Sequence, residues 1–167
     1  MTTLPSALLI AATLILQRAL GAPGGPHWSG LLLLPAVWIV GPILLGGGRR
    51  WVWVALAIGL GWDLLLEPIV GPGAIAWSAA ALVSLWLAGI VADRSPKAWF
   101  ALAAVVTLVV IQVHRVVLLP LGVSRPLGWT TVAASVAVTA VWCGLVGWVL
   151  ALDLPARWRT WRARKLR

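Results

Sequence analysis

The chain has 167 residues, of which 62% are hydrophobic and 10% charged; its mean hydropathy is +1.01 and its formal net charge is +9. A soluble domain is usually about half apolar and a quarter charged, so this composition excludes an ordinary soluble protein and is typical of a helical membrane protein. The apolar runs do not alternate as β-barrel strands do, and the single cysteine, Cys143, excludes an intramolecular disulfide and a multi-cysteine metal site.

Long apolar runs separated by Gly, Pro and Arg predict an all-α bundle of six transmembrane helices. Each run is close in length to the ~20 residues that a bilayer requires. Pro35 and Pro42 predict a kink in the second run. A cleaved signal peptide is not expected, because the initial MTTLPS has no Lys or Arg. The predicted spans are residues 4–20, 28–45, 51–66, 74–92, 98–119 and 128–152, followed by a tail of residues 153–167.

The thirteen basic residues are distributed unevenly between the two sides of the predicted bundle. The even-numbered connections and the tail hold ten of them, and the odd-numbered connections hold three, Arg18, Arg115 and Arg125. The positive-inside rule therefore predicts that both termini lie in the cytoplasm.

Two of the four acidic residues stand in otherwise apolar sequence: Asp63 lies within the third predicted span, and Glu67 directly follows it. At ~1.5 Å per residue, Asp63 lies about 20 Å from the start of that span, in its outer half. Polar residues of the first and fifth spans lie at similar depth, and an unpaired carboxylate at mid-bilayer costs at least ~2.5 kcal/mol. We therefore expect an intramembrane polar network in which Asp63 and Glu67 pair with basic side chains. Its members would be Gln17, Arg18, Asp63, Glu67, His114 and Arg115.

Two interpretations of this network compete. In the first, the acidic residues have a chemical function, as a proton or cation relay or as a substrate site. In the second, they have a structural function: they lock the first, third and fifth spans together or form a docking site for a partner. The second interpretation is favoured, because basic partners are available at matching depth. His114 has no second His or Cys at ligand spacing, so no metal, cofactor or catalytic set is expected, and the protein is expected not to be an enzyme.

Small residues recur at intervals of four along two predicted spans. Each set lines one helix face, where small side chains allow another helix to approach closely. That face packs either within the protein's own bundle or against a partner's transmembrane helix or a second copy of the chain. The candidate packing residues are Ala76, Ala80, Ser84 and Ala88 in the fourth span and Thr131, Ser135, Thr139, Cys143 and Gly147 in the sixth.

The tail LDLPARWRTWRARKLR is strongly basic. Beside a hydrophobic helix, such a cluster indicates contact with anionic phospholipid rather than with nucleic acid. Asp153 and Pro155 fit the start of a short interfacial helix, and a disordered basic tail is the alternative. The candidate headgroup contacts are Arg157, Trp158, Arg159, Trp161, Arg162, Arg164, Lys165 and Arg167.

The segment AIGLGWDLLLEPIVGPGAIAWSAAALVSLWLAG resembles the rod shape-determining protein MreD family. In that family a glycine-rich third span ends in an aspartate and leucines, and a Gly-containing turn and a small-residue fourth span follow. Gln17 at the end of the first span fits the same pattern. The matching residues are Gly59, Asp63, Leu64, Leu65, Gly71 and Gly73.

The resemblance implies a non-enzymatic, multi-pass protein of the bacterial inner membrane. It would bind MreC within the rod complex, or elongasome, which determines cell shape through peptidoglycan synthesis by RodA–PBP2, with MreB as an indirect partner. The family's fold is also similar to the S-components of energy-coupling-factor transporters. A vitamin-binding S-component, with the polar network as its pocket, is therefore the alternative function.

Overall fold

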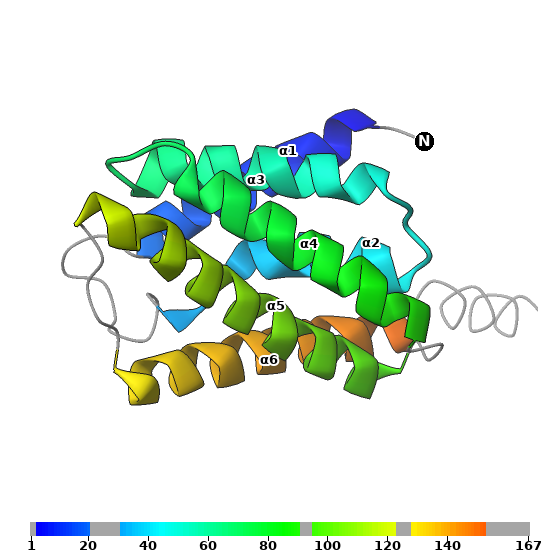
Figure 1. Cartoon of the computed structure of the whole chain (residues 1–167). Coiled ribbons are helices and arrows are strands. Elements are labelled where there is room, and N and C mark those ends of the chain that lie inside the picture. Colours follow the sequence, from blue (N-terminus) through cyan, green and yellow to red (C-terminus); the bar gives the residue numbers. More distant parts are fainter. Residues whose placement is uncertain (1–2, 21–30, 91–94, 123–127, 153–167) are drawn as a thin grey trace, which may run out of the picture.

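The computed structural model describes residues 3–20, 31–90, 95–122 and 128–152, and this part of the chain is entirely helical, which confirms the all-α prediction. Within those ranges it contains six α-helices and two short 3-10 helices (Figure 1). The helices are α1 (Thr3–Leu20), η2 (Leu34–Ala36), α2 (Val37–Leu44), α3 (Arg50–Leu66), α4 (Pro72–Ile90), α5 (Pro96–Leu118), η3 (Leu119–Leu121) and α6 (Trp129–Ala151).

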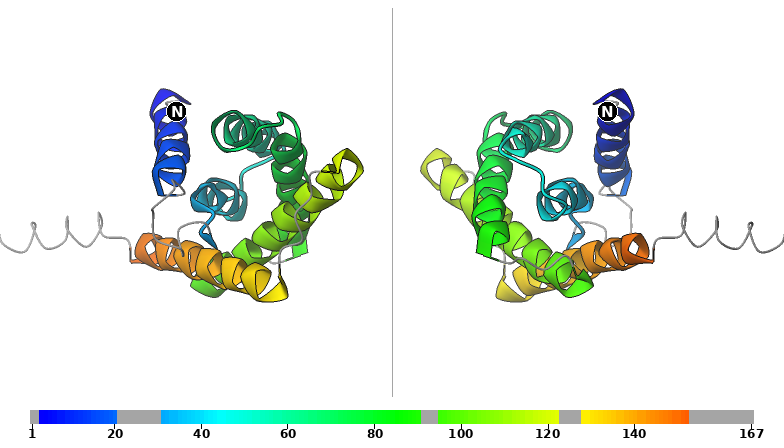
Figure 2. Two further views of the ribbon diagram at one scale, coloured as in Figure 1. Left: turned by 90° about the vertical axis from the view of Figure 1, so that its left-hand side faces the viewer. Right: turned by 90° about the vertical axis from the view of Figure 1, so that its right-hand side faces the viewer.

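The helices run alternately in opposite directions, so α1 begins and α6 ends at the same end of the bundle (Figure 1). Helices α3, α4, α5 and α6 pack in that order as an arc of neighbours. In the end views of Figure 2, α2 lies inside this arc and α1 lies at its open side. Helix α1 packs against α3 and η2, whereas α2 contacts α3, α4, α5 and α6. The shortest α-helix in the described ranges is therefore the central one.

Proline and glycine lie near the two ends of the short helical stretch formed by η2 and α2. Pro35 stands in the first turn of η2, where its missing N–H costs no helical hydrogen bond. The chain leaves α2 after Leu44, two residues beyond Pro42, and Gly46 turns it with a φ of 91°. Helical structure thus covers 34–44 of the predicted span 28–45. Residues 31–33 precede the helix, and 28–30 lie outside the described part.

A tryptophan holds three helices together near the end of the bundle at which α1 begins and α6 ends. Trp99 of α5 is 3% exposed, and its ring lies against two glycines. A Cβ atom on Gly41 of α2 would lie 2.8 Å from this ring, and one on Gly147 of α6 would lie 2.5 Å from it. Side chains at those positions would overlap the indole, so the two glycines allow α2, α5 and α6 to pack around it.

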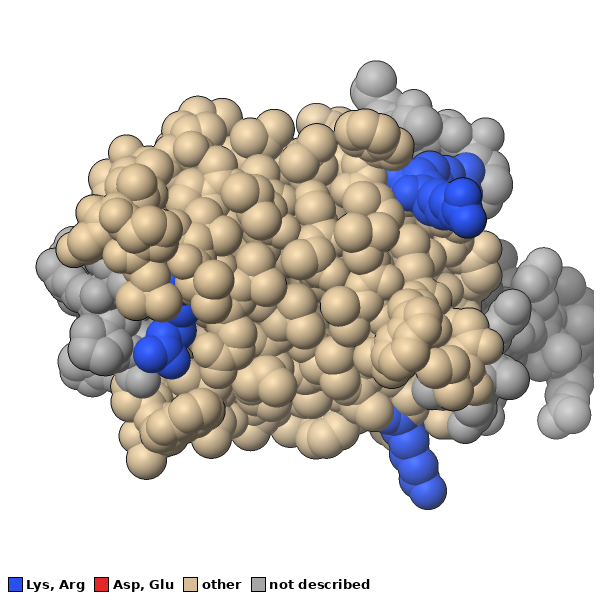
Figure 3. Space-filling view, in the orientation of Figure 1, with Lys and Arg blue, Asp and Glu red and all other residues tan. Residues whose placement is uncertain are grey.

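The surface of the bundle is largely apolar. On the face shown in Figure 3, Lys and Arg lie toward the ends, and the area between them carries no charged side chain. Three segments in the described ranges are long and apolar enough to cross a membrane: Pro72–Ile90, Pro96–Leu121 and Trp129–Ala151. The predictions of six crossings and of a cytoplasmic location for both termini remain predictions.

Candidate functional site

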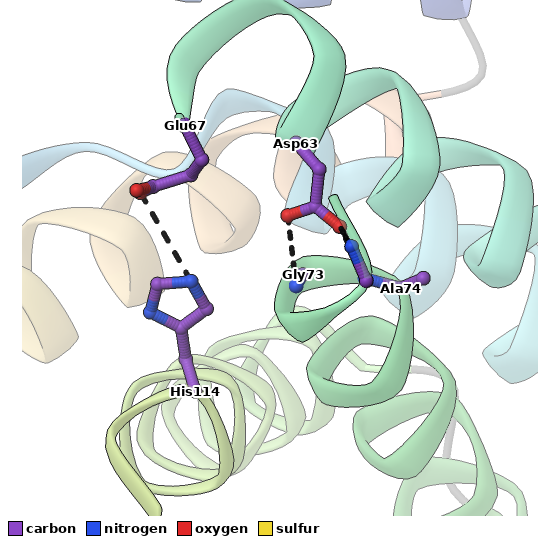
Figure 4. A network of polar contacts seen from close by, with 6 residues as sticks. Asp63, Glu67, Gly73, Ala74 and His114 are labelled. Carbon is purple, nitrogen blue, oxygen red and sulfur yellow. Dashed lines mark hydrogen bonds and ion pairs between the residues drawn. The ribbon is translucent and has the colours of Figure 1, made fainter. Parts of the chain in front are cut away.

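Asp63 is completely buried near the end of α3 and accepts three hydrogen bonds from backbone amides. Its Oδ2 accepts from the N–H of Gly71 at 2.7 Å and of Ala74 at 3.2 Å, and its Oδ1 accepts from the N–H of Gly73 at 2.8 Å (Figure 4). An ionised carboxylate can only accept hydrogen bonds, so three donors match it. The predicted pairing of Asp63 with a basic side chain is therefore wrong: backbone amides and the positive end of α4 surround the carboxylate instead.

Asp63 acts as the N-terminal cap of a helix that follows it in the chain. The first N–H groups of a helix lack partners within the helix, and a Ser, Thr, Asp or Asn just before it usually supplies one. Here Gly71 occupies that position and has no side chain. Pro72 has no N–H, and the N–H of Ile75 bonds to the carbonyl of Gly71 at 3.0 Å. With Asp63 bound to the two amides between them, every N–H of the first turn is accounted for.

Glycines make this contact between α3 and α4 possible. A Cβ on Gly59 would lie 2.5 Å from the Cα of Ala74, and a Cβ on Gly73 would lie 2.9 Å from the Cγ of Asp63. Gly71 has a φ of +126°, which favours glycine. The residues of the MreD-like segment thus form one structural unit, in which α3 and the start of α4 touch backbone to backbone and Asp63 fastens the turn between them.

Glu67 and His114 form the one contact between an acidic and a basic side chain within the described part of the chain, and it is an ion pair only with a protonated His114. Glu67 follows α3 and His114 lies in α5, with 4.0 Å between Oε1 of Glu67 and Nε2 of His114 (Figure 4). This distance is too long for a hydrogen bond, and both side chains are partly exposed, at 31% and 22%. The structure therefore brings these two members of the predicted network together in a loose contact at the same end of the bundle as Asp63.

The remaining predicted network members do not join Asp63. Gln17 of α1 is 3% exposed, and its Oε1 accepts a hydrogen bond from the N–H of Leu34 at 3.0 Å. Arg18 is exposed, and Arg115 is partly exposed in the last turn of α5. Neither arginine forms an ion pair with a residue of the described ranges. The expected single network is thus replaced by an Asp63 cap, a Glu67–His114 pair and a separate Gln17 contact.

Side chains of α1 and α6 satisfy the backbone that leads into η2. Besides the bond from Leu34 to Gln17, the N–H of Leu33 donates to Thr139 at 3.1 Å, and Ser135 donates to the carbonyl of Leu31 at 2.6 Å. Non-helical backbone in a bundle interior is tolerated only where such partners exist. Gln17, Ser135 and Thr139 therefore fix the position at which the chain enters the central helix.

The small-residue stripes face the interior of the protein's own bundle. Ala76, Ala80 and Ser84 of α4 and Thr139 and Cys143 of α6 are inaccessible to solvent. Ser135 and Gly147 are buried as well, whereas Ala88 and Thr131 are partly buried. The hypothesis that these stripes receive a partner's helix is therefore wrong, because neighbouring helices of the same chain already cover them. The proposed headgroup contacts of the tail lie outside the described residues.

Sequence reasoning missed two interhelical contacts. The ring of Trp99 fills the space beside two glycines of other helices, a contact that the sequence analysis did not anticipate. Trp38 of α2 donates from Nε1 to Thr13 of α1 at 3.2 Å. Pairs of glycines in neighbouring spans are the signal that points to a large ring between them, whereas nothing in the local sequence indicates the contact between Trp38 and Thr13.

No protein-family model, no curated protein and no solved structure matches the chain. The likeness to MreD therefore depends on the residues of the α3–α4 segment themselves. The geometry of that segment gives Gly59, Asp63, Gly71 and Gly73 a common role, which is to join α3 to the start of α4, whereas Leu64 and Leu65 are exposed.

Proposed function

We propose that the chain is a non-enzymatic, six-pass scaffold of a bacterial inner membrane that acts in cell-shape determination as MreD does. In this proposal both termini are cytoplasmic and the bundle binds MreC. Through MreC it supports peptidoglycan synthesis by RodA–PBP2 and is linked indirectly to MreB. A scaffold requires a rigid bundle with an apolar outer surface on which other membrane helices can pack.

The main support for the proposal is the hydrogen bonding of the buried Asp63 carboxylate. A relay carboxylate or a substrate ligand needs an oxygen directed at water, an ion or a ligand. Both oxygens of Asp63 are instead occupied by backbone amides of the same chain, and the residue is fully buried. The most polar group of the bundle interior thus serves the fold, which is what a scaffold requires.

The alternative S-component function receives less support from the same contacts. A vitamin pocket would use polar side chains that converge on a shared space. Asp63 instead bonds to backbone at the start of α4, and Gln17 and Thr139 bond to the backbone of the lead-in to η2. They leave no common polar lining among the residues that the structure describes.

Purification of the tagged chain from native membranes in mild detergent tests the proposal. We expect MreC and the RodA–PBP2 synthase to be retained, and depletion of the protein to change rod-shaped cells into round ones. Recovery of ATPase subunits with a bound vitamin, and unchanged cell shape on depletion, would overturn the scaffold proposal in favour of a transporter component. A matched control is the Glu67→Gln variant, because loss of a loose, partly exposed pair should leave the bundle and its partners unchanged.

A further inference from the structure

An open apolar groove lies on the outer surface where α5 and α6 pack together. It has a volume of about 380 Å³ and is lined by Pro96, Lys97, Phe100, Val141, Gly144 and Leu145. Its α5 wall begins at the first residue of that helix, so the groove starts at the end of the bundle and extends inward from it. Both helices that form its walls are long and apolar enough to cross a membrane.

Gly144 lies among the residues that line this groove. A Cβ on Gly144 would meet Phe100 at 3.5 Å, which is ordinary van der Waals contact, so the packing of the two helices does not require a glycine here. The side chains around it are large and exposed: Phe100 at 46%, Val141 at 50% and Leu145 at 54%. Because Gly144 has no side chain, the apolar groove between these exposed side chains remains unfilled.

The charge at the mouth of the groove is positive and has no acidic neighbour in the described ranges. Lys97 is exposed, and Arg49 and Arg50 begin α3 at the same end of the bundle. The described acidic residues, Asp63 and Glu67, lie at the opposite end of α3. An apolar groove that opens beside an exposed lysine matches a molecule with a hydrocarbon chain and an anionic head.

We propose that this groove binds an anionic phospholipid of the surrounding leaflet, with its phosphate against Lys97 and one acyl chain across Gly144. The dipole of α5, which begins beside Lys97, also favours a negative group there. The chain's own basic tail and a second copy's Lys97 would both bring like charge to the mouth, so neither is the occupant. The inference requires only that α5 and α6 face lipid, and it does not depend on which proteins the chain binds.

Native mass spectrometry of the full chain from bilayers of equal parts phosphatidylglycerol and phosphatidylcholine tests this site. A basic side chain near the membrane surface contributes ~1 kcal/mol of attraction to anionic lipid, which corresponds to about a fivefold preference. We expect Lys97→Gln to reduce the retained ratio of phosphatidylglycerol to phosphatidylcholine about fivefold. Gly144→Leu should reduce the retention of both lipids, because the new side chain fills the channel.

Two variants provide matched controls. Arg49→Gln removes a charge from the same end of the bundle without touching the groove, and Gly89→Leu adds a side chain at an exposed glycine with open space around it. Both should retain lipid like the unmodified chain. The proposal is overturned if Arg49→Gln lowers the lipid ratio as much as Lys97→Gln does, or if Gly144→Leu retains lipid normally. Loss of a co-purifying protein from Gly144→Leu with unchanged lipid would also overturn it, since the groove would then hold a partner's helix.

Discussion

Replacing Asp63 with asparagine should destabilise the bundle strongly, although the two side chains have the same shape. Asparagine has one acceptor oxygen and one amide group that only donates. If its oxygen takes the place of Oδ2, the amides of Gly71 and Ala74 keep an acceptor, but the NH₂ group then faces the N–H of Gly73. Asp63→Asn therefore removes one hydrogen bond and leaves a buried donor unpaired. The other two hydrogen bonds remain, but their acceptor is now neutral instead of charged.

The magnitude follows from these three losses. A hydrogen bond to a charged group contributes ~1.5–3 kcal/mol, and bonds to a neutral acceptor are about half as strong. One lost and two weakened bonds give a destabilisation of roughly 3–6 kcal/mol. This is a large part of the ~5–15 kcal/mol by which folded proteins are stable, and for a chain of this size it corresponds to a decrease in Tm of roughly 10 °C.

Thermal unfolding of the detergent-solubilised protein, followed by gel filtration of what remains folded, would measure this effect. Glu67→Gln is the matched control, because it also neutralises an acid of the same segment but breaks only a 4.0 Å contact and should cost less than ~1 kcal/mol. Gly73→Ala tests the same cap without changing charge, since its Cβ would lie 2.9 Å from the Cγ of Asp63. Equal melting temperatures for Asp63→Asn, Gly73→Ala and Glu67→Gln would refute the assignment of Asp63 as a cap.

Three further substitutions test other contacts by the same melting assay. Gln17→Leu should cost ~1–3 kcal/mol, because a buried backbone N–H at the start of η2 loses its acceptor; an unchanged Tm would contradict the contact. Gly147→Val should prevent normal folding because its side chain would overlap Trp99, whereas Gly144→Ala on the same helix should be tolerated. Equal accumulation of those two variants would show that the Trp99 packing is described incorrectly. His114→Gln should change Tm by only ~2 °C or less, since its ion pair is partly exposed, and a larger loss would reveal a stronger bond than the 4.0 Å contact indicates.

The helical segments could be predicted from the sequence because long apolar runs and the Gly and Pro residues between them are local signals. Helix α2 was the hardest to predict. Its apolar run continues before the helix, yet the backbone of Leu31 and Leu33 takes hydrogen-bond partners from α6. Those partners are as many as 106 positions away, so no local pattern indicates where α2 begins.

The position of the candidate site could be predicted from the sequence, but the hydrogen-bond partners of Asp63 could not. The position of Asp63 in an apolar run indicated that a partner was needed, and the visible candidates were cationic side chains. The true donors are backbone amides, which every residue except proline carries and which composition therefore does not reveal. The GPG turn after Asp63 was the available signal, because small residues there allow amides to approach a neighbouring helix. For the stripes, spacing indicated a close contact, but it could not indicate which helix would cover it.

The lead-in to the central helix has a consequence for how the protein is made. The N–H of Leu33 bonds to Thr139, and the carbonyl of Leu31 accepts from Ser135. Neither hydrogen bond can form before α6 has been synthesised. Ser135 lies 104 residues after Leu31, and Thr139 lies 106 residues after Leu33. The ribosome must therefore add about a hundred residues after Leu31 and Leu33 before their partners are present. The backbone that leads into η2 must therefore lack these two partners during synthesis, and nascent chains that stop before α6 should be preferred substrates of quality-control proteases.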